Sequence, residues 1–152
     1  MPADVTQYIF RDPGAGERVG VAGAEHTITL AGSQTGGAFS ADVIDLSPQW
    51  TGPPPHVHQS HEETFIVLAG KVAYQLGEQR VIGAPGSTLY VPRGVRHAFA
   101  NPHDEPARLL NLFSPAGYEK FFGELADLIA AAHGQPSLSD IQSLFAKYDT
   151  VM

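Results

Sequence analysis

The residues best suited to chemistry in this sequence are three histidines and a glutamate. His56 and His58, in "GPPPHVHQSHEETFIVLAG", are two positions apart, so on an extended strand both imidazoles point to the same face. Glu63 begins the apolar run of that stretch, and a chain reversal just before it can bring its carboxylate to the same point. His97, in "GSTLYVPRGVRHAFAN", is the candidate for a further donor. Imidazole nitrogens and a carboxylate oxygen together predict a site for a divalent transition metal.

The remaining histidines differ from these in their surroundings. His61 lies on the same loop as His58 but has the wrong parity to join it, so it is a candidate only for the mouth of the site. His26, His103 and His133 have no such partners in the sequence, and we predict that they lie at the surface.

The elements that must position the candidate ligands are short strands. Sixteen glycines and twelve prolines, most of them before residue 118, break the chain into short apolar or alternating segments, a pattern typical of a sandwich or barrel. The predicted strands are 26–31, 37–46, 62–69, 71–76, 79–83, 87–91, 96–101 and 107–113. They place the barrel at residues 26–113, after an irregular arm at 1–25 that could hold one short strand, "YIF".

The pattern changes to a helical one at residue 114. Ser114 and Pro115 predict a helix start, with the serine as N-cap and the proline at the first helical position. Ser137 opens a second helix in "SLSD". Apolar residues follow at helical spacing: Phe121, Phe122, Leu125, Leu128, Ile129 and Ala132, then Ile141, Leu144, Phe145 and Tyr148. We expect these helices, within 114–152, to pack on the barrel or on a partner subunit.

Composition limits the classes of partner. The 152 residues suit a single domain, 1–152, and the net charge of −7 argues against nucleic-acid binding. The absence of cysteine excludes thiolate ligands and cysteine nucleophiles. No secretory signal opens the sequence, and no apolar run approaches the ~20 residues that span a bilayer. We therefore expect a cytoplasmic protein that binds a small molecule, without nucleic acid or membrane, and a homodimer whose arm covers a sheet edge.

The two histidine stretches resemble the paired signatures of the cupin family. The first fits G-x5-H-x-H-x4-E-x6-G, except that three residues instead of five follow the leading glycine. The matching residues are Gly52, His56, His58, Glu63 and Gly70. The second fits G-x5-P-x-G-x2-H-x3-N in full, with Gly86, Pro92, Gly94, His97 and Asn101. The resemblance covers residues 26–113.

The resemblance implies an all-β fold, a jelly-roll barrel of the double-stranded β-helix type, here followed by C-terminal α-helices. It also implies that His56, His58, Glu63 and His97 bind one divalent metal ion, whether Fe, Mn, Ni, Co, Cu or Zn. Four protein ligands leave one or two coordination positions open, as in catalytic sites. Glu63 is then also the candidate catalytic base. Asn101 has the parity to face inward and is expected to serve structure.

Within the cupins, the chain is similar to single-domain quercetin 2,3-dioxygenase-like members, which implies a dioxygenase that uses O2 on an enolisable aromatic or hydrophobic molecule. Two alternatives stay open: an isomerase, cyclase or dehydratase without O2 chemistry, and a non-enzymatic binding module. The candidate pocket residues are Phe39, Phe65, Val67, Tyr74, Phe99 and Phe113. No arginine or lysine occupies an evident inward position near the ligands, which argues against a phosphate or dicarboxylate substrate.

Overall fold

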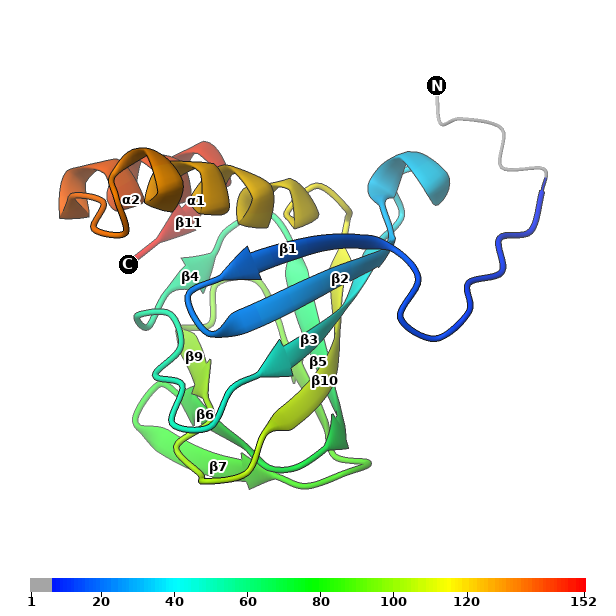
Figure 1. Cartoon of the computed structure of the whole chain (residues 1–152), viewed down its shortest axis with the longest axis horizontal. Coiled ribbons are helices and arrows are strands. Elements are labelled where there is room, and N and C mark those ends of the chain that lie inside the picture. The colour runs from blue at the N-terminus through cyan, green and yellow to red at the C-terminus, as the bar shows by residue number, and fades with distance from the viewer. Residues whose placement is uncertain (1–6) are drawn as a thin grey trace.

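The structure is a computed structural model that describes residues 7–152, and its strands curve around one interior to form a barrel (Figure 1). The larger sheet contains, in order, β1 (Glu17–Val21), β2 (Ala24–Leu30), β3 (Ser40–Leu46), β10 (Ala107–Ser114), β5 (Glu62–Ala69) and β8 (Thr88–Val91). A second sheet contains β7 (Gln79–Gly83), β6 (Val72–Leu76) and β9 (His97–Ala100). A short third pair joins β4 (Val57–His58) to β11 (Thr150–Val151). Every strand pair is antiparallel, and the mainly β fold with C-terminal helices is the one predicted.

Alternation of buried and less buried side chains along β5 and β10 builds much of the interior. In β5 the side chains of Glu63, Phe65 and Val67 are buried, whereas their neighbours are less so. The same period of two in β10 turns Leu109 and Asn111 inward. Because polar residues share this inward face with apolar ones, the barrel carries a packed core at one end and a polar site at the other.

Two glycines are required where the chain turns closely past itself. Gly52 has φ of 74°, and a Cβ there would lie 1.9 Å from the carbonyl oxygen of Phe99. Gly70 has φ of 69° between β5 and β6, and a Cβ there would lie 2.4 Å from the carbonyl oxygen of Pro106. Both contacts are with backbone, which cannot move aside, so a larger residue would displace the loop that leads to His56 or the turn that follows the strand of Glu63.

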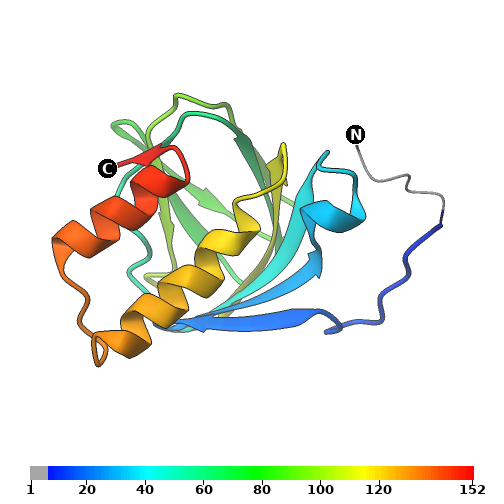
Figure 2. The same ribbon diagram turned by 90° about the horizontal axis from the view of Figure 1, so that it is seen from above.

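Two helices cover one end of the barrel. Helices α1 (Glu119–Ala131) and α2 (Leu138–Lys147) lie side by side over the end opposite β7, as Figures 1 and 2 show. The rings of Phe121 and Phe145 are 5.0 Å apart and join the helices to each other. Their apolar faces therefore form a second core over the barrel mouth, as the periodicity predicts. Neither helix is long and apolar enough to cross a membrane, within the part of the chain that the structure describes.

The structure corrects two boundaries. Strand β1 lies inside the segment predicted as an irregular arm, whereas "YIF" at 8–10 forms no strand; residues 1–6 of that arm lie outside the described residues. Ser114 does not cap a helix: it ends β10 opposite Glu62, and its hydroxyl donates to the carbonyl of Ala38 at 3.0 Å. Helix α1 starts five residues later, at Glu119. Ser137 does cap α2, and accepts a hydrogen bond from the backbone of Asp140 at 3.1 Å.

Candidate metal centre

The four predicted ligands converge inside the barrel. One ligand atom from each of His56, His58, Glu63 and His97 lies within 4.8 Å of the others. All four side chains are buried, with 2–4% of each residue exposed. A cluster of this size and composition matches the donor set of a mononuclear transition-metal site.

Backbone pairing brings together ligands that are far apart in the sequence. The amide of His56 donates to the carbonyl of His97 at 3.0 Å, and the amide of His97 donates back at 2.9 Å. This bridge joins the segment before β4 to β9, and β4 then carries His58 to the same side. Glu63 stands near the start of β5, where the inward parity of that strand turns its carboxylate to the histidines.

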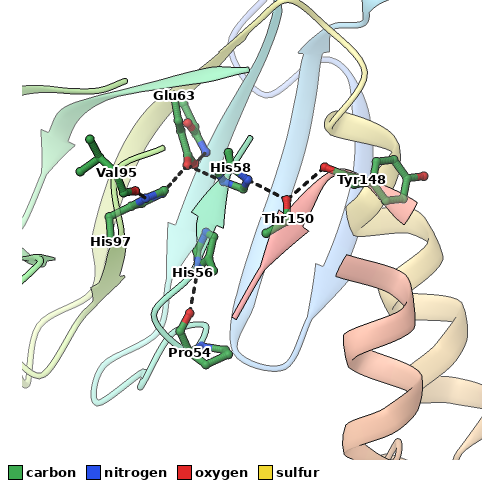
Figure 3. A network of polar contacts seen from close by, with 9 residues as sticks. Pro54, His56, His58, Glu63, Val95, His97, Tyr148 and Thr150 are labelled. Carbon is green, nitrogen blue, oxygen red and sulfur yellow. Dashed lines mark hydrogen bonds and ion pairs between the residues drawn. The ribbon is translucent and has the colours of Figure 1, made fainter. Parts of the chain in front are cut away.

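Each histidine is held through its Nδ1 atom, as Figure 3 shows. The Nδ1 atoms of His56 and His97 lie 2.8 Å and 2.9 Å from the carbonyl oxygens of Pro54 and Val95. A carbonyl oxygen only accepts hydrogen bonds, so Nδ1 carries a proton in both rings, and in the neutral ring this proton leaves Nε2 without one. This tautomer is the one needed for a metal ligand that coordinates through Nε2.

The third histidine is held by the C-terminal strand. His58 Nδ1 donates to the hydroxyl oxygen of Thr150 at 2.8 Å, and that hydroxyl donates in turn to the carbonyl of Tyr148 at 3.1 Å (Figure 3). Because the threonine proton is engaged with a carbonyl, its oxygen is available as an acceptor. All three rings therefore present Nε2 to the centre, and the residues fit a bound divalent ion.

Glu63 faces the histidines with one oxygen and is anchored through the other. Its Oε2 lies 3.1 Å from His58 Nε2 and 2.8 Å from His97 Nε2, while Oε1 accepts from Asn111 Nδ2 at 2.9 Å. Burial acts to raise the pKa of Glu63, but the hydrogen bonds with His58 and His97 outweigh it and hold the pKa well below its usual range. The carboxylate is thus ionised and ready to bind a cation.

Burial acts on the pKa of His56 in the direction opposite to its effect on a carboxyl group. It lowers the pKa of that imidazole to about 4, against the opposing attraction of Glu63. A neutral imidazole at neutral pH is the form that coordinates a metal.

The ligands open into a cavity of about 310 Å³ between the barrel mouth and the two helices. His56, His58 and Glu63 line its polar end. Most of the remaining wall is apolar, and includes Trp50, Phe99, Tyr118, Phe121, Leu125 and Phe145. This arrangement of a few convergent polar groups in an apolar pocket is typical of small-molecule sites.

The predicted pocket residues take different places around this cavity. Phe99 lines it, as predicted. The others are not among its lining residues: Phe65, Val67 and Tyr74 belong to the barrel core, and Phe113 belongs to the core under the helices. Phe39 is 37% exposed outside the cavity. All of the predicted pocket residues except Phe39 are buried, but strand parity could not indicate at what depth in the barrel each one lies.

Two histidines outside the ligand set are buried, although His26 was predicted at the surface and His61 only at the mouth of the site. His26, predicted at the surface, is 3% exposed because β2 turns it inward against Asp42. His61 is also buried, but lies beside a separate pocket formed with Pro115 and Tyr118 and does not line the ligand cavity. Burial lowers the pKa of His61 to about 4. Asn101 is structural as expected, and donates to the carbonyls of Ser47 and Glu105.

The sequence reading missed Asn111 and the contribution of the C-terminal segment. A signal for Asn111 existed, since it shares parity with Leu109 and Phe113 in an otherwise apolar strand. Thr150 had no such signal, because its contact with His58 spans 92 residues of sequence.

Comparison with known proteins identifies the barrel. A family model described as "Cupin domain" matches residues 42–113. The quercetin 2,3-dioxygenase of Bacillus subtilis (strain 168) is 27% identical over 127 residues, which cover 84% of this chain. This chain spans 37% of the length of that enzyme and 54% of the length of three further curated relatives.

Solved structures share the fold at low sequence identity. An RmlC-like cupin from Shewanella frigidimarina NCIMB 400 superposes with a TM-score of 0.63 at 18% identity, covering 75% of this chain and 96% of its own. The ectoine synthase from P. lautus gives a TM-score of 0.55 at 14% identity, covering 64% of this chain and 71% of its own. Such likenesses show the fold alone. The chain therefore has the cupin fold, and its residues 42–113, which match the cupin family model, contain both motifs and the four convergent residues.

Proposed function

We propose that the protein is a metal-dependent cupin dioxygenase that acts on an enolisable aromatic or hydrophobic small molecule. The observation that carries this proposal is the opening of the four-ligand cluster into a largely apolar cavity of about 310 Å³. The likeness to the Bacillus quercetin 2,3-dioxygenase supports the class of reaction.

The ion would supply Lewis-acid activation of a substrate oxygen and a site for O2 chemistry. The chain itself supplies the proton acceptor and the dry surroundings. Glu63 has one oxygen fixed by Asn111 and the other directed to the ligand cluster, where it can take a proton from the substrate. The aromatic side chains of α1 and α2 cover this point and limit the access of water.

The chemistry of the cavity wall sets the substrate class. Among the described residues that line the cavity there is no arginine or lysine, so nothing there would neutralise a phosphate or a second carboxylate. Stacked and tilted aromatic rings instead suit a planar apolar molecule. A flavonol combines such a ring system with an acidic enol and is the substrate class we test.

The test combines elemental analysis of freshly purified protein with O2 uptake on a panel of flavonols. We expect one equivalent of a transition metal per chain and O2 uptake with a flavonol. Metal without O2 uptake would contradict the dioxygenase proposal, and turnover without O2 would assign isomerase, cyclase or dehydratase chemistry. Folded protein that stays metal-free after reconstitution would leave a binding module.

Two neighbouring glutamates provide a matched pair of variants. Glu63→Ala should lose the metal and the activity while the fold is kept, because it removes a ligand from the cluster. Glu62→Ala should keep both, because that carboxylate binds Arg93 at the surface. Normal metal content in Glu63→Ala would contradict the assignment of the ligands.

A further inference from the structure

A second polar pair faces the ligand cavity on strands that the metal centre does not use. His26 on β2 and Asp42 on β3 are joined by an Nδ1 to Oδ2 distance of 2.6 Å. Asp42 is fully buried, and His26 is 3% exposed and lines the same cavity as His56 and Glu63. The pair is separate from the cluster of potential metal ligands.

Two oxygen atoms beside this pair lack hydrogen-bond partners. Asp42 Oδ1 and Asn111 Oδ1 are buried without a partner, and the two residues lie directly opposite each other on β3 and β10. Buried polar atoms in proteins are nearly always satisfied by protein, water or ligand. Asn111 lines the cavity and Asp42 does not, so the unpartnered oxygen of Asn111 marks a polar place in the cavity wall next to the pair.

The geometry of the pair prepares His26 to accept a proton. Burial raises the pKa of Asp42, and the hydrogen bond and charge interaction with His26 oppose this rise. When the carboxylate of Asp42 is ionised, the proton between the two residues is on Nδ1, and Nε2 is left as an acceptor. The ring is also fixed in plane, since it stacks on Phe122 of α1 at a centroid distance of 3.8 Å and an interplanar angle of 23°. An imidazole held by a carboxylate on one nitrogen and open on the other is the arrangement of a general base.

A purely structural pair would be a poor choice at this position. A buried ion pair generally stabilises a fold no more than apolar residues of similar volume would. The surrounding wall of Phe122, Phe121 and Leu125 is apolar, so a second apolar layer would pack there without cost of desolvation. The placement of the pair in the wall of the cavity therefore suggests binding rather than stability.

We propose that His26, oriented by Asp42, binds the acidic hydroxyl of an aromatic ligand whose other oxygens face the metal centre. In this step the O–H bond of the ligand breaks and an N–H bond forms at His26 Nε2. The ligand becomes a phenolate, and Asp42 stabilises the resulting imidazolium. The proposal rests on the proposed function in placing the ligand in this cavity, and it assigns the ligand class as a planar aromatic molecule with an acidic hydroxyl.

The test uses 7-hydroxyflavone, whose single hydroxyl is a phenol remote from its carbonyl oxygen, as a probe under anaerobic conditions, with full-length protein both as purified and after dialysis against EDTA. The anion of this probe absorbs at longer wavelength than the neutral form, so its spectrum reports where the proton resides. We expect wild-type protein in both states to bind the probe as the anion at a pH at which the free probe is neutral.

His26→Gln should lose the anion band and bind the probe about 10- to 100-fold more weakly. Its amide still donates to Asp42, but it cannot accept the proton. His103→Gln, outside the cavity, should behave as wild type. An anion band of wild-type strength in His26→Gln, or no band with metal-free wild-type protein, would overturn the proposal.

Two further measurements keep the result decisive. If His26→Gln does not fold, the double variant His26→Phe/Asp42→Leu replaces the pair with apolar groups, and it should fold and also lack the anion band. Metal content of His26→Gln should equal that of wild type, which separates this role from a disturbed metal centre. Because the probe is bound without O2 and without metal, failure of the dioxygenase proposal would leave this outcome unchanged.

Discussion

Thr150 shows how one residue outside the sequence motifs acts on a metal ligand. Its hydroxyl accepts the Nδ1 proton of His58, and it is itself held by the carbonyl of Tyr148. The hydrogen bond selects the tautomer of His58 and the angle of its ring. Partners of this kind are typically worth 10- to 100-fold in metal affinity.

We therefore expect Thr150→Val to bind the metal about 10- to 100-fold more weakly than wild type. Thr150→Ser keeps the hydroxyl and should retain most of the affinity. Competition with a chromophoric chelator measures both. Equal affinity in the valine variant would show that β4 alone is sufficient to orient His58.

The sequence predicted the four clustered residues well, from their types and spacing, but it predicted the residues around them less well. His56 and His58 could be assigned from parity, and His97 from the second motif, because these signals are local. The burial of His26 could not be predicted, because it depends on Asp42, which is 16 residues away on another strand. A lone histidine in an alternating segment gives no indication of which face its partner will occupy.

At the scale of elements, Glu119 connects the helices to the barrel. Its Oε1 accepts from the amide of Gly32 at 2.7 Å, and its Oε2 accepts from the amide of Gly117 at 2.6 Å. Burial acts to raise the pKa of Glu119, but these backbone hydrogen bonds outweigh it and leave the pKa below its usual range. The first turn of α1 is thereby fixed to the short 3-10 helix at Gly32–Gln34.

A carboxyl group with a lowered pKa in the folded state stabilises the protein above its unfolded pKa, and this stabilisation is lost as the pH falls through the lower, folded value. Glu119→Gln should therefore reduce the free energy of unfolding by about 1–2 kcal/mol at pH 7. The difference from wild type should shrink as the pH falls below about 4.3. Urea denaturation at several pH values checks this. Exposed Glu78→Gln is the control, and a difference for Glu119→Gln that does not change with pH would contradict the role of its charge.

Helices and strands were largely predictable where their own sequence carries a periodic pattern of apolar residues. The eight predicted strands are present, since glycine and proline mark their ends and alternation marks their faces. The two-residue strands β4 and β11 are too short to carry any period, and they exist only because they pair with each other. Ser137 caps a helix, whereas Ser114 has a similar local sequence but is held by the pairing of β10 with β5.

At the scale of the whole molecule, the segment before β1 supports the proposal of a homodimer. Tyr8 is 95% exposed and Phe10 is 78% exposed, although both are large apolar side chains. Strands β1 and β8 stand at the ends of the larger sheet. An exposed apolar segment that leads into the edge strand β1 favours association with a second copy of the chain.

We expect a dimer by size-exclusion chromatography with light scattering. The double variant Tyr8→Ser/Phe10→Ser should raise the dissociation constant of the dimer at least about 10-fold. The reason is that burial of each aromatic ring in the interface would contribute on the order of 2 kcal/mol to the free energy of association. Leu138→Ser on α2, also exposed, should leave it unchanged. A monomeric wild-type protein would contradict the proposal.

The cavity has two walls that come from separate stretches of the chain. The metal ligands lie on the barrel between residues 56 and 97, whereas much of the apolar wall lies on the helices after residue 117. Selection can therefore act on the two walls almost independently. A library varied only at Phe121, Leu125, Ile129 and Ile141 would reshape the space offered to a ligand while the four candidate metal ligands stay unchanged. The four candidate metal ligands can therefore stay constant during evolution while changes in the helices alter which small molecules fit the cavity.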